Sequence, residues 1–216
     1  MWGRRARRTL EPANQNRGSR MRHEFLTIAF LGSTFATGLP AQTAAAPSPA
    51  VSSQLDRVRA ALDKYQDPIK AVHDGYLSTV GCVEFPEAGG AGQVPYAAGG
   101  MGVHFLNLEL MGPTVDSLRP QVLLYEPHGD TLQLVAAEWL VPTQASHTRP
   151  ALFGQPFDGP MEGHHPIMPE SLHHWDLHVW LWLPNPAGMF SPTNPALQCP
   201  DGVYSFRDKA PLVVKP

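Results

Sequence analysis

Prolines set the first limit on how this chain can fold. The sequence of 216 residues contains 23 prolines, and all of them except Pro12 and Pro40 lie beyond residue 46. Proline lacks a backbone N–H and fixes φ, so it interrupts helices and central strands. Because 43% of the residues are hydrophobic, the chain can still bury a core. We therefore expect a folded domain of short strands joined by rigid loops.

The first 46 residues differ in composition from the rest of the chain. They contain seven arginines and two glutamates, followed by a mostly apolar stretch over 25–39 and then an alanine-rich segment. A basic region, a short apolar region and small residues, in this order, are typical of a secretory signal peptide. A short buried helix is the alternative. The expected organisation is a signal peptide with an upstream extension over 1–46, a linker over 47–51 and a single globular domain over 52–216.

Charge and hydropathy narrow the classes of function. Residues 47–216 carry nine basic and 17 acidic side chains, a net charge of −8, whereas the whole chain has a net charge of −3. An acidic domain is unsuited to electrostatic binding of nucleic acid, so we expect no nucleic-acid partner. No apolar run reaches the roughly 20 residues that a membrane-spanning helix needs. We expect a secreted or periplasmic protein that has no transmembrane helix after signal removal.

The two cysteines, Cys82 and Cys199, both lie in the expected domain. Two cysteines of an exported protein usually pair, because the compartment is oxidising. The expected disulfide would join a segment near the start of the domain to one near its end. Two separate buried thiols are the alternative.

Hydrophobic periodicity predicts an α+β fold. Helical structure is expected over about 52–75, where Ser53 can cap a first helix and Asp67-Pro68 can begin a second. The candidate strands are 103–110, 120–127, 131–141 and 173–184, with one further short strand near the C-terminus. The expected architecture is an N-terminal helical segment packed on a mainly antiparallel β-sheet, either a sandwich or an open barrel.

The candidate strands 120–127 and 131–141 are expected to form a hairpin, because a turn-forming Pro-His-Gly-Asp sequence separates them. A regular register pairs Glu126 with Thr131. It also places Glu126 and Glu138 on opposite faces, unless a bulge shifts the pairing. Both faces are mainly apolar, so the hairpin should be covered on both sides.

Histidines and carboxylates gather in the most strand-like part of the domain. Five of the ten histidines lie between residues 164 and 178. Imidazole and carboxylate groups together are ligands for Zn, Cu, Mn or Fe. The sequence therefore predicts a divalent-metal site in a pocket, with His104, Glu138, His174 and His178 as ligands. Glu126 and Asp176 are the alternative ligands or outer partners of that site.

Strand geometry restricts this ligand set. In a regular strand His174 and His178 lie about 13 Å apart, so they share an ion only if the chain turns or bulges near Trp175. Asp176 and His178 lie on one face at a spacing of about 6.6 Å, which suits a shared ion. A buried polar network without metal is the alternative. His164 and His165 belong to the proline-rich stretch 142–171 and are expected to be solvated, or to bind metal adventitiously.

Other chemistry finds less support in the sequence. There is no G-x-S-x-G motif of a serine hydrolase. The glycine-rich stretch 86–102 matches no phosphate-binding motif and is expected to be a surface loop, or to fold over a pocket. The main hypothesis is that the protein is exported and binds a divalent metal ion. An extension of this hypothesis is that it is a metalloenzyme acting on an unknown small molecule. The alternative is a non-catalytic extracytoplasmic binding or envelope module that uses the Trp-rich strand at 173–184.

Several short motifs occur together in one order, namely MGVHF, LLYEP, AAEW, HHWDLHVWLW, NPAGMF and NPALQC. In this combination the chain resembles a family of small exported bacterial proteins that has no assigned activity. The resemblance covers roughly residues 55–199 and implies no reaction. It implies one recurring framework that includes His104, Glu126, Glu138, His174, His178 and Cys199.

Overall fold

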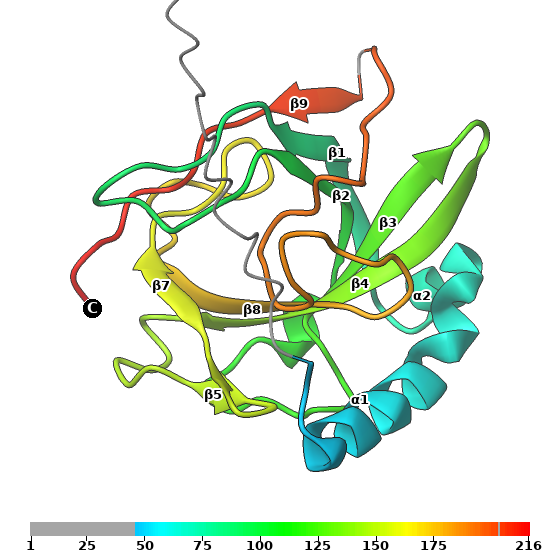
Figure 1. The fold of residues 1–216 in the computed structure, drawn as a ribbon, viewed down its shortest axis with the longest axis horizontal. Coiled ribbons are helices and arrows are strands. Elements are labelled where there is room, and N and C mark those ends of the chain that lie inside the picture. The colour runs from blue at the N-terminus through cyan, green and yellow to red at the C-terminus, as the bar shows by residue number, and fades with distance from the viewer. Residues whose placement is uncertain (1–45, 203) are drawn as a thin grey trace, which may run out of the picture. The chain divides into compact units, whose positions relative to one another are not determined.

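A curled, mainly antiparallel sheet organises the protein (Figure 1). The computed structural model describes residues 46–202 and 204–216. Seven strands form the main sheet in the order β7–β8–β4–β3–β2–β1–β9, and β5 and β6 pair separately. The β1–β9 pair is parallel, while the other pairs are antiparallel. The expected α+β class is confirmed, whereas the expected signal peptide lies almost wholly outside the described residues.

The helical segments are α1 (Pro49–Leu62), η1 (Asp63–Gln66), α2 (Pro68–His73) and η2 (Leu108–Leu110). The first strands are β1 (Leu77–Phe85), β2 (Gly99–Leu106), β3 (Val122–His128) and β4 (Thr131–Pro142). The later strands are β5 (Ala151–Leu152), β6 (Gln155–Pro156), β7 (Asp158–Met161), β8 (His174–Trp180) and β9 (Ser205–Arg207).

The start of α1 differs from the sequence-based expectation. The helix begins at Pro49, and Ser48 rather than Ser53 is its N-cap, accepting a hydrogen bond from the Val51 N–H at 3.4 Å. Proline fits the first turn of a helix because its missing N–H would have no partner there. α2 begins as predicted, with the Asp67 side chain accepting from the backbone N–H of Ile69 at 3.0 Å.

The helices cover one side of the sheet and close the main core over it (Figure 1). The buried face of α1 (Leu55, Val58 and Leu62) belongs to the same core cluster as Phe105 and Tyr125 of the sheet. Both faces of the β3–β4 hairpin are buried over most of its length, as predicted. A second, smaller core is made by Val83, Phe85, Val94, Tyr96, Met101, Met161 and Ala210.

The predicted register of the β3–β4 hairpin is wrong. Glu126 lies opposite Gln133 rather than Thr131, because the turn is tighter than expected. Val135 is an additional residue between the pairs Leu124↔Ala136 and Tyr125↔Leu134, and it shifts the register. A bulge of this kind moves the following side chains to the other face. Glu126 and Glu138 therefore lie on the same face of the hairpin, whereas a regular register would place them on opposite faces.

The expected disulfide is confirmed. Cys82 of β1 is bonded to Cys199, 117 residues further along the chain, with their Cα atoms 5.6 Å apart. The bond therefore ties β1, the neighbour of the edge strand β9, to the segment that leads into β9. In the described part of the chain, no helix has both the length and the apolar character needed to cross a membrane.

Candidate metal centre

Strand β8 carries the polar side chains of the candidate site on one face. Successive side chains of a strand alternate between its two faces, so His174, Asp176 and His178 point the same way. Every residue of β8 is buried. The opposite face of β8, with Trp175 and Leu177, belongs to the main core. The three polar side chains are thus held inside the protein without contact with bulk water.

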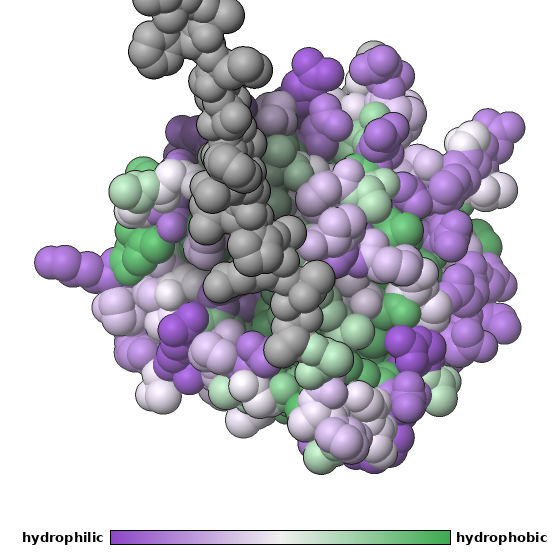
Figure 2. All heavy atoms as spheres, viewed as in Figure 1, coloured by the Kyte–Doolittle hydropathy of each residue, from purple (hydrophilic) through white to green (hydrophobic). Residues whose placement is uncertain are grey.

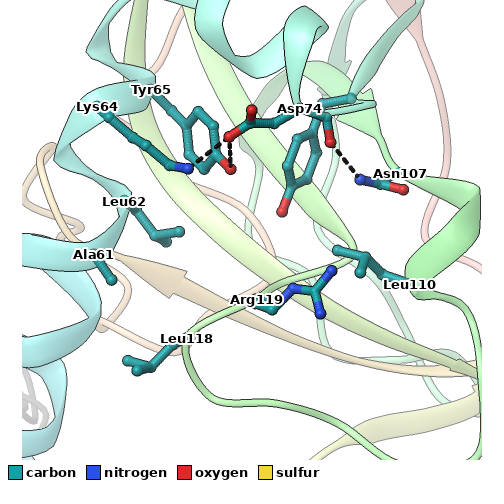
Figure 3. Close-up of a pocket in the computed structure, with 10 residues that line it drawn as sticks. Ala61, Leu62, Lys64, Tyr65, Asp74, Asn107, Leu110, Leu118 and Arg119 are labelled. Carbon is teal, nitrogen blue, oxygen red and sulfur yellow. Dashed lines mark hydrogen bonds and ion pairs between the residues drawn. The ribbon is translucent and has the colours of Figure 1, made fainter.

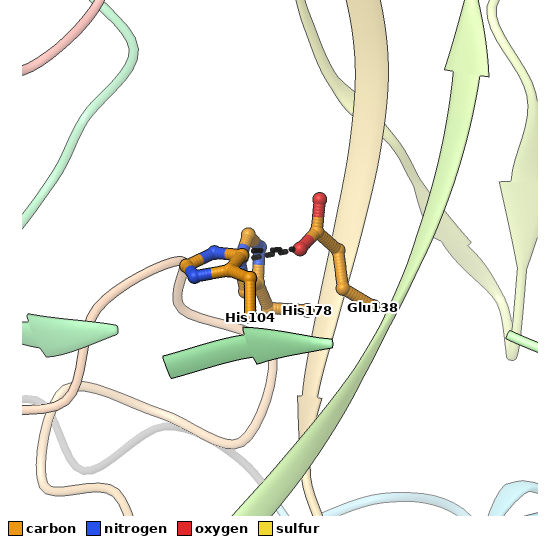
Figure 4. Close-up of side chains that lie close together, drawn as sticks. All are labelled: His104, Glu138 and His178. Carbon is orange, nitrogen blue, oxygen red and sulfur yellow. Dashed lines mark ion pairs between the residues drawn. The ribbon is translucent and has the colours of Figure 1, made fainter. Parts of the chain in front are cut away.

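The first cluster consists of His104, Glu138 and His178 (Figure 4). The register places Glu138 of β4 directly opposite His178 of β8, and β2 brings His104 to the same carboxylate. The Oε2 atom of Glu138 lies 3.6 Å from Nε2 of His178 and 3.8 Å from Nε2 of His104. Figure 4 shows both imidazoles directed at the carboxylate.

The second cluster consists of His164, His174 and Asp176. The Oδ2 atom of Asp176 lies 3.5 Å from Nε2 of His174 and 3.9 Å from Nε2 of His164. Its other oxygen, Oδ1, lies 3.9 Å from Nδ1 of His178, which belongs to the first cluster. Asp176 and His178 therefore stand between the two clusters.

These separations are too long for hydrogen bonds but suit ligands of a common ion. N–H···O hydrogen bonds in proteins span about 2.7–3.2 Å. Two atoms that are each about 2.1 Å from a tetrahedral zinc ion are separated by roughly 3.4 Å. The donor atoms within each cluster all lie within 4.8 Å of one another. Each cluster could therefore hold a metal ion after small side-chain adjustments.

Eight buried polar atoms of the two clusters have no hydrogen-bond partner among the described residues. Buried polar atoms are almost always hydrogen-bonded, so such a concentration in one place is unusual. The atoms concerned are His104 Nδ1, Glu138 Oε2, His164 Nδ1, His174 Nε2, both carboxylate oxygens of Asp176 and both ring nitrogens of His178.

Burial sets the charge of the first cluster. It lowers the pKa of His104 to about 3 and that of His178 to about 4, because charged imidazolium is poorly solvated inside the protein. The two rings are therefore uncharged at neutral pH, the form that binds metals. Burial, with a smaller contribution from the charge of Asp176, raises the pKa of Glu138 well above its usual range.

The carboxylates near the second cluster are in contrasting environments. Burial disfavours ionisation of Asp176, but the imidazoles of His164 and His174 outweigh it and lower the pKa of Asp176. Asp158 of β7 lies opposite Asp176 in the register. Burial, together with the charge of Asp176, raises the pKa of Asp158 to about 7. The second cluster is thus the place where a negative charge persists inside the protein.

The structure brings together three of the four predicted ligands. His104, Glu138 and His178 form the first cluster, whereas His174 lies in the second. The reason is that β8 stays regular through Trp175, so His174 and His178 do not converge. Asp176 is a member of the second cluster, while Glu126 belongs to neither and instead contacts the ring of His128 at 2.7 Å.

Two residues of the second cluster region were not anticipated from the sequence. The expectation of a solvated ring is wrong for His164, which is only 3% exposed, although His165 is indeed exposed. Tyr96, within the glycine-rich stretch, is buried as well, and its hydroxyl lies 3.2 Å from Nε2 of His164. An apolar residue two or three positions before each, Val94 and Met161, is the available signal that these loops fold inward.

A narrow hollow adjoins the first cluster. Its volume is about 10 Å³, and its lining residues are Thr79, His104, Leu106, Val122, Glu138, Ile167 and Met168. A cavity of about 10–15 Å³ is enough for one water molecule. The first cluster therefore has room for one small exogenous ligand beside its three side chains.

A larger hollow of about 350 Å³ lies at the surface, beside η1 and α2 (Figure 3). Its lysine and its acid are already partnered, because Lys64 Nζ and the Tyr65 hydroxyl both donate to Asp74 Oδ2, at 2.6 and 2.9 Å. On the face drawn in Figure 2, hydrophilic and hydrophobic residues are intermixed.

The tryptophans of β8 do not form a recognition surface. Trp175 and Trp180 are buried, and their indole N–H groups donate to the backbone carbonyls of Ser146 and Ser191. They serve as core residues of the sheet. This placement weighs against the alternative of a binding module built on the Trp-rich strand.

Comparisons with protein-family models, with curated proteins and with solved structures returned no match for the chain. The chemistry of the site therefore has to be inferred from its own side chains.

Proposed function

We propose that the chain is an exported protein that binds a divalent metal ion through the first cluster, His104, Glu138 and His178. The observation that carries this proposal is that Glu138 Oε2 and His178 Nε2 are buried 3.6 Å apart without hydrogen-bond partners. Nε2 of the buried His104 lies 3.8 Å from the same carboxylate oxygen. Leaving a buried polar group without a partner is unfavourable by about 1–3 kcal/mol. One cation at the centre would satisfy the carboxylate and both imidazoles together.

The composition of the first cluster favours particular metals. Two imidazoles and one carboxylate suit Zn²⁺, Fe²⁺ or Cu²⁺ better than Mg²⁺ or Ca²⁺, which prefer ligand shells made of oxygen. Three protein ligands with a fourth position left for water are typical of catalytic rather than structural zinc sites. The hollow beside Glu138 offers that fourth position. This supports a metalloenzyme as the extension of the proposal.

Export is supported by the disulfide between Cys82 and Cys199. Disulfides form and persist in oxidising compartments and are rare in the cytosol. The basic and apolar N-terminal region gives the proposed route of export.

Metal analysis of the purified protein tests the metal site. We expect bound Zn, Fe, Cu or Mn after gel filtration, and a rise in the unfolding temperature when Zn²⁺ is added to chelator-treated protein. His104→Gln should lose one ion per chain. The matched control His128→Gln, which changes an exposed histidine at the end of the β3–β4 hairpin, should keep it. Absence of metal together with no thermal shift, or identical metal content in His104→Gln, would contradict the proposal.

A further inference from the structure

The second cluster has a complete set of potential metal ligands of its own. We propose that His164, His174 and Asp176 bind a second divalent cation, beside the ion of the first cluster and with its own ligands. The three side chains are 3%, 0% and 0% exposed. Binding here does not require the first cluster to be occupied, so the two proposals can fail separately.

The hydrogen bond of His174 fixes the direction of its lone pair. Nδ1 of His174 lies 3.3 Å from the backbone carbonyl oxygen of Leu172. A carbonyl only accepts, so Nδ1 carries a proton, and the metal-binding form of the ring then has its lone pair on Nε2. This Nε2 faces Oδ2 of Asp176, also an acceptor, at 3.5 Å. Two buried acceptors that face each other need a proton or a cation between them.

A second histidine and a phenol complete the coordination. Nε2 of His164 approaches the same Oδ2 atom at 3.9 Å. The hydroxyl of Tyr96 is hydrogen-bonded to that Nε2 atom at 3.2 Å. The same separation is close to the roughly 3.4 Å between two ligands of a tetrahedral ion, so an ion could replace the shared proton. The Tyr96 ring is held by its stack on His164 and by an edge contact with Phe85. Tyr96 would thus be the fourth donor to the proposed ion.

Asp176 also connects the second site to the first. Its Oδ2 atom belongs to the second cluster, whereas its Oδ1 atom faces Nδ1 of His178 at 3.9 Å. The Nε2 atom of His178 points to Glu138 in the first cluster. A carboxylate behind a metal-binding histidine is a common outer partner that orients the ring. Asp176 would therefore bind one ion and orient a ligand of the other, which makes the two sites one centre.

Both sites have the same donor classes, namely two imidazoles and one carboxylate, so one probe metal reports on both. Co²⁺ is suitable because it occupies zinc sites and its visible absorption depends on coordination geometry. We expect Co²⁺ and Zn²⁺ to bind, whereas Ca²⁺ and Mg²⁺ at the same concentration should not displace them, because both prefer oxygen ligands.

Stoichiometry measured by equilibrium dialysis of the chelator-treated protein against Co²⁺ tests the second site. We expect two ions per chain in the wild type, one in His174→Gln, one in His104→Gln and none in the double variant. His73→Gln, an exposed histidine at the end of α2, is the matched control and should bind two ions. If His174→Gln fails to fold by circular dichroism, His164→Gln takes its place, since His164 lies on a loop rather than on β8.

The outcomes separate the two proposals. One ion in the wild type that is lost only in His104→Gln would overturn the second site and leave the first intact. One ion that is lost only in His174→Gln or His164→Gln would overturn the first site and leave the second intact. No bound Co²⁺ in the folded wild type would overturn both.

Discussion

At the scale of single residues, the carboxylate of Glu138 decides the chemistry of the first cluster. Glu138→Gln keeps the size of the side chain and removes its ability to carry a negative charge. Loss of an outer partner lowers metal affinity by roughly 10- to 100-fold, so loss of a direct ligand should lower it at least as much. A competition titration with a chromophoric chelator and Zn²⁺ measures this. Glu126→Gln, which alters a glutamate in neither cluster, should bind as the wild type does.

The hydroxyl of Tyr96 provides a second test at this scale. Tyr96→Phe removes one oxygen and leaves the ring in contact with Phe85. We expect Co²⁺ affinity at the second cluster to fall while the first cluster is unaffected. The visible spectrum of the His104→Gln protein, in which only the second site binds, should also change shape when Tyr96→Phe is added. An unchanged spectrum and affinity would exclude Tyr96 as a ligand.

Single residues also show how far the sequence could predict the site. His104 stands out as a polar residue among apolar neighbours, and the alternation of β8 puts His174, Asp176 and His178 on one face. His164 gives no such signal, because it is one of two adjacent histidines in a proline-rich loop. Which of the two turns inward depends on contacts with Tyr96 and Phe85, which come from distant segments.

At the scale of elements, metal binding should rigidify the loop that carries His164. This loop is closed by backbone hydrogen bonds from Gly163 N–H to Glu170 and from Met168 N–H to His164. An ion shared by His164 and β8 would oppose its local opening. We expect slower hydrogen exchange of the amides in 162–172 when Zn²⁺ is added. In His174→Gln the protection should disappear, and equal exchange with and without Zn²⁺ in the wild type would contradict the second site.

Elements were predictable where local signals agree, and were misplaced where the local signal is absent or offers two choices. β8 and β4 follow from their runs of β-branched, aromatic and apolar residues. The register of the β3–β4 hairpin was missed because the additional residue, Val135, has no distinguishing sequence feature. The start of α1 was misplaced because Ser48-Pro49 and Ser53 both offer a cap, and the structure uses the former.

At the scale of the whole molecule, the sheet brings together residues that are far apart in sequence. Both clusters draw on β8, but the first also needs β2 and β4, and the second needs the loop after β7. The sequence indicates the ligand types and their strands. It does not indicate how they divide into two sites, because that depends on the pairing of β4 with β8 and on which loop covers the sheet.

The disulfide should contribute much of the stability of this molecule. It closes a segment of the chain with a sequence separation of 117 residues. The chain-entropy model gives an upper value of about 4–5 kcal/mol for loops of this length. Typical domains are stable by only about 5–15 kcal/mol. We therefore expect the Cys82→Ala/Cys199→Ala double variant to unfold at a clearly lower urea concentration than the wild type. Unfolding is followed by tryptophan fluorescence.

The control for this prediction is the wild type under reducing conditions, which should match the double variant. A decrease of less than about 1 kcal/mol in the free energy of unfolding would mean that the unfolded chain is already restricted, or that the remaining contacts of β1 hold the sheet together.

Neither of the two clusters contains a sulfur ligand. The double variant should therefore still bind Co²⁺ with the wild-type stoichiometry at temperatures where it is folded. Loss of metal at those temperatures would show instead that the disulfide positions β2 and His104.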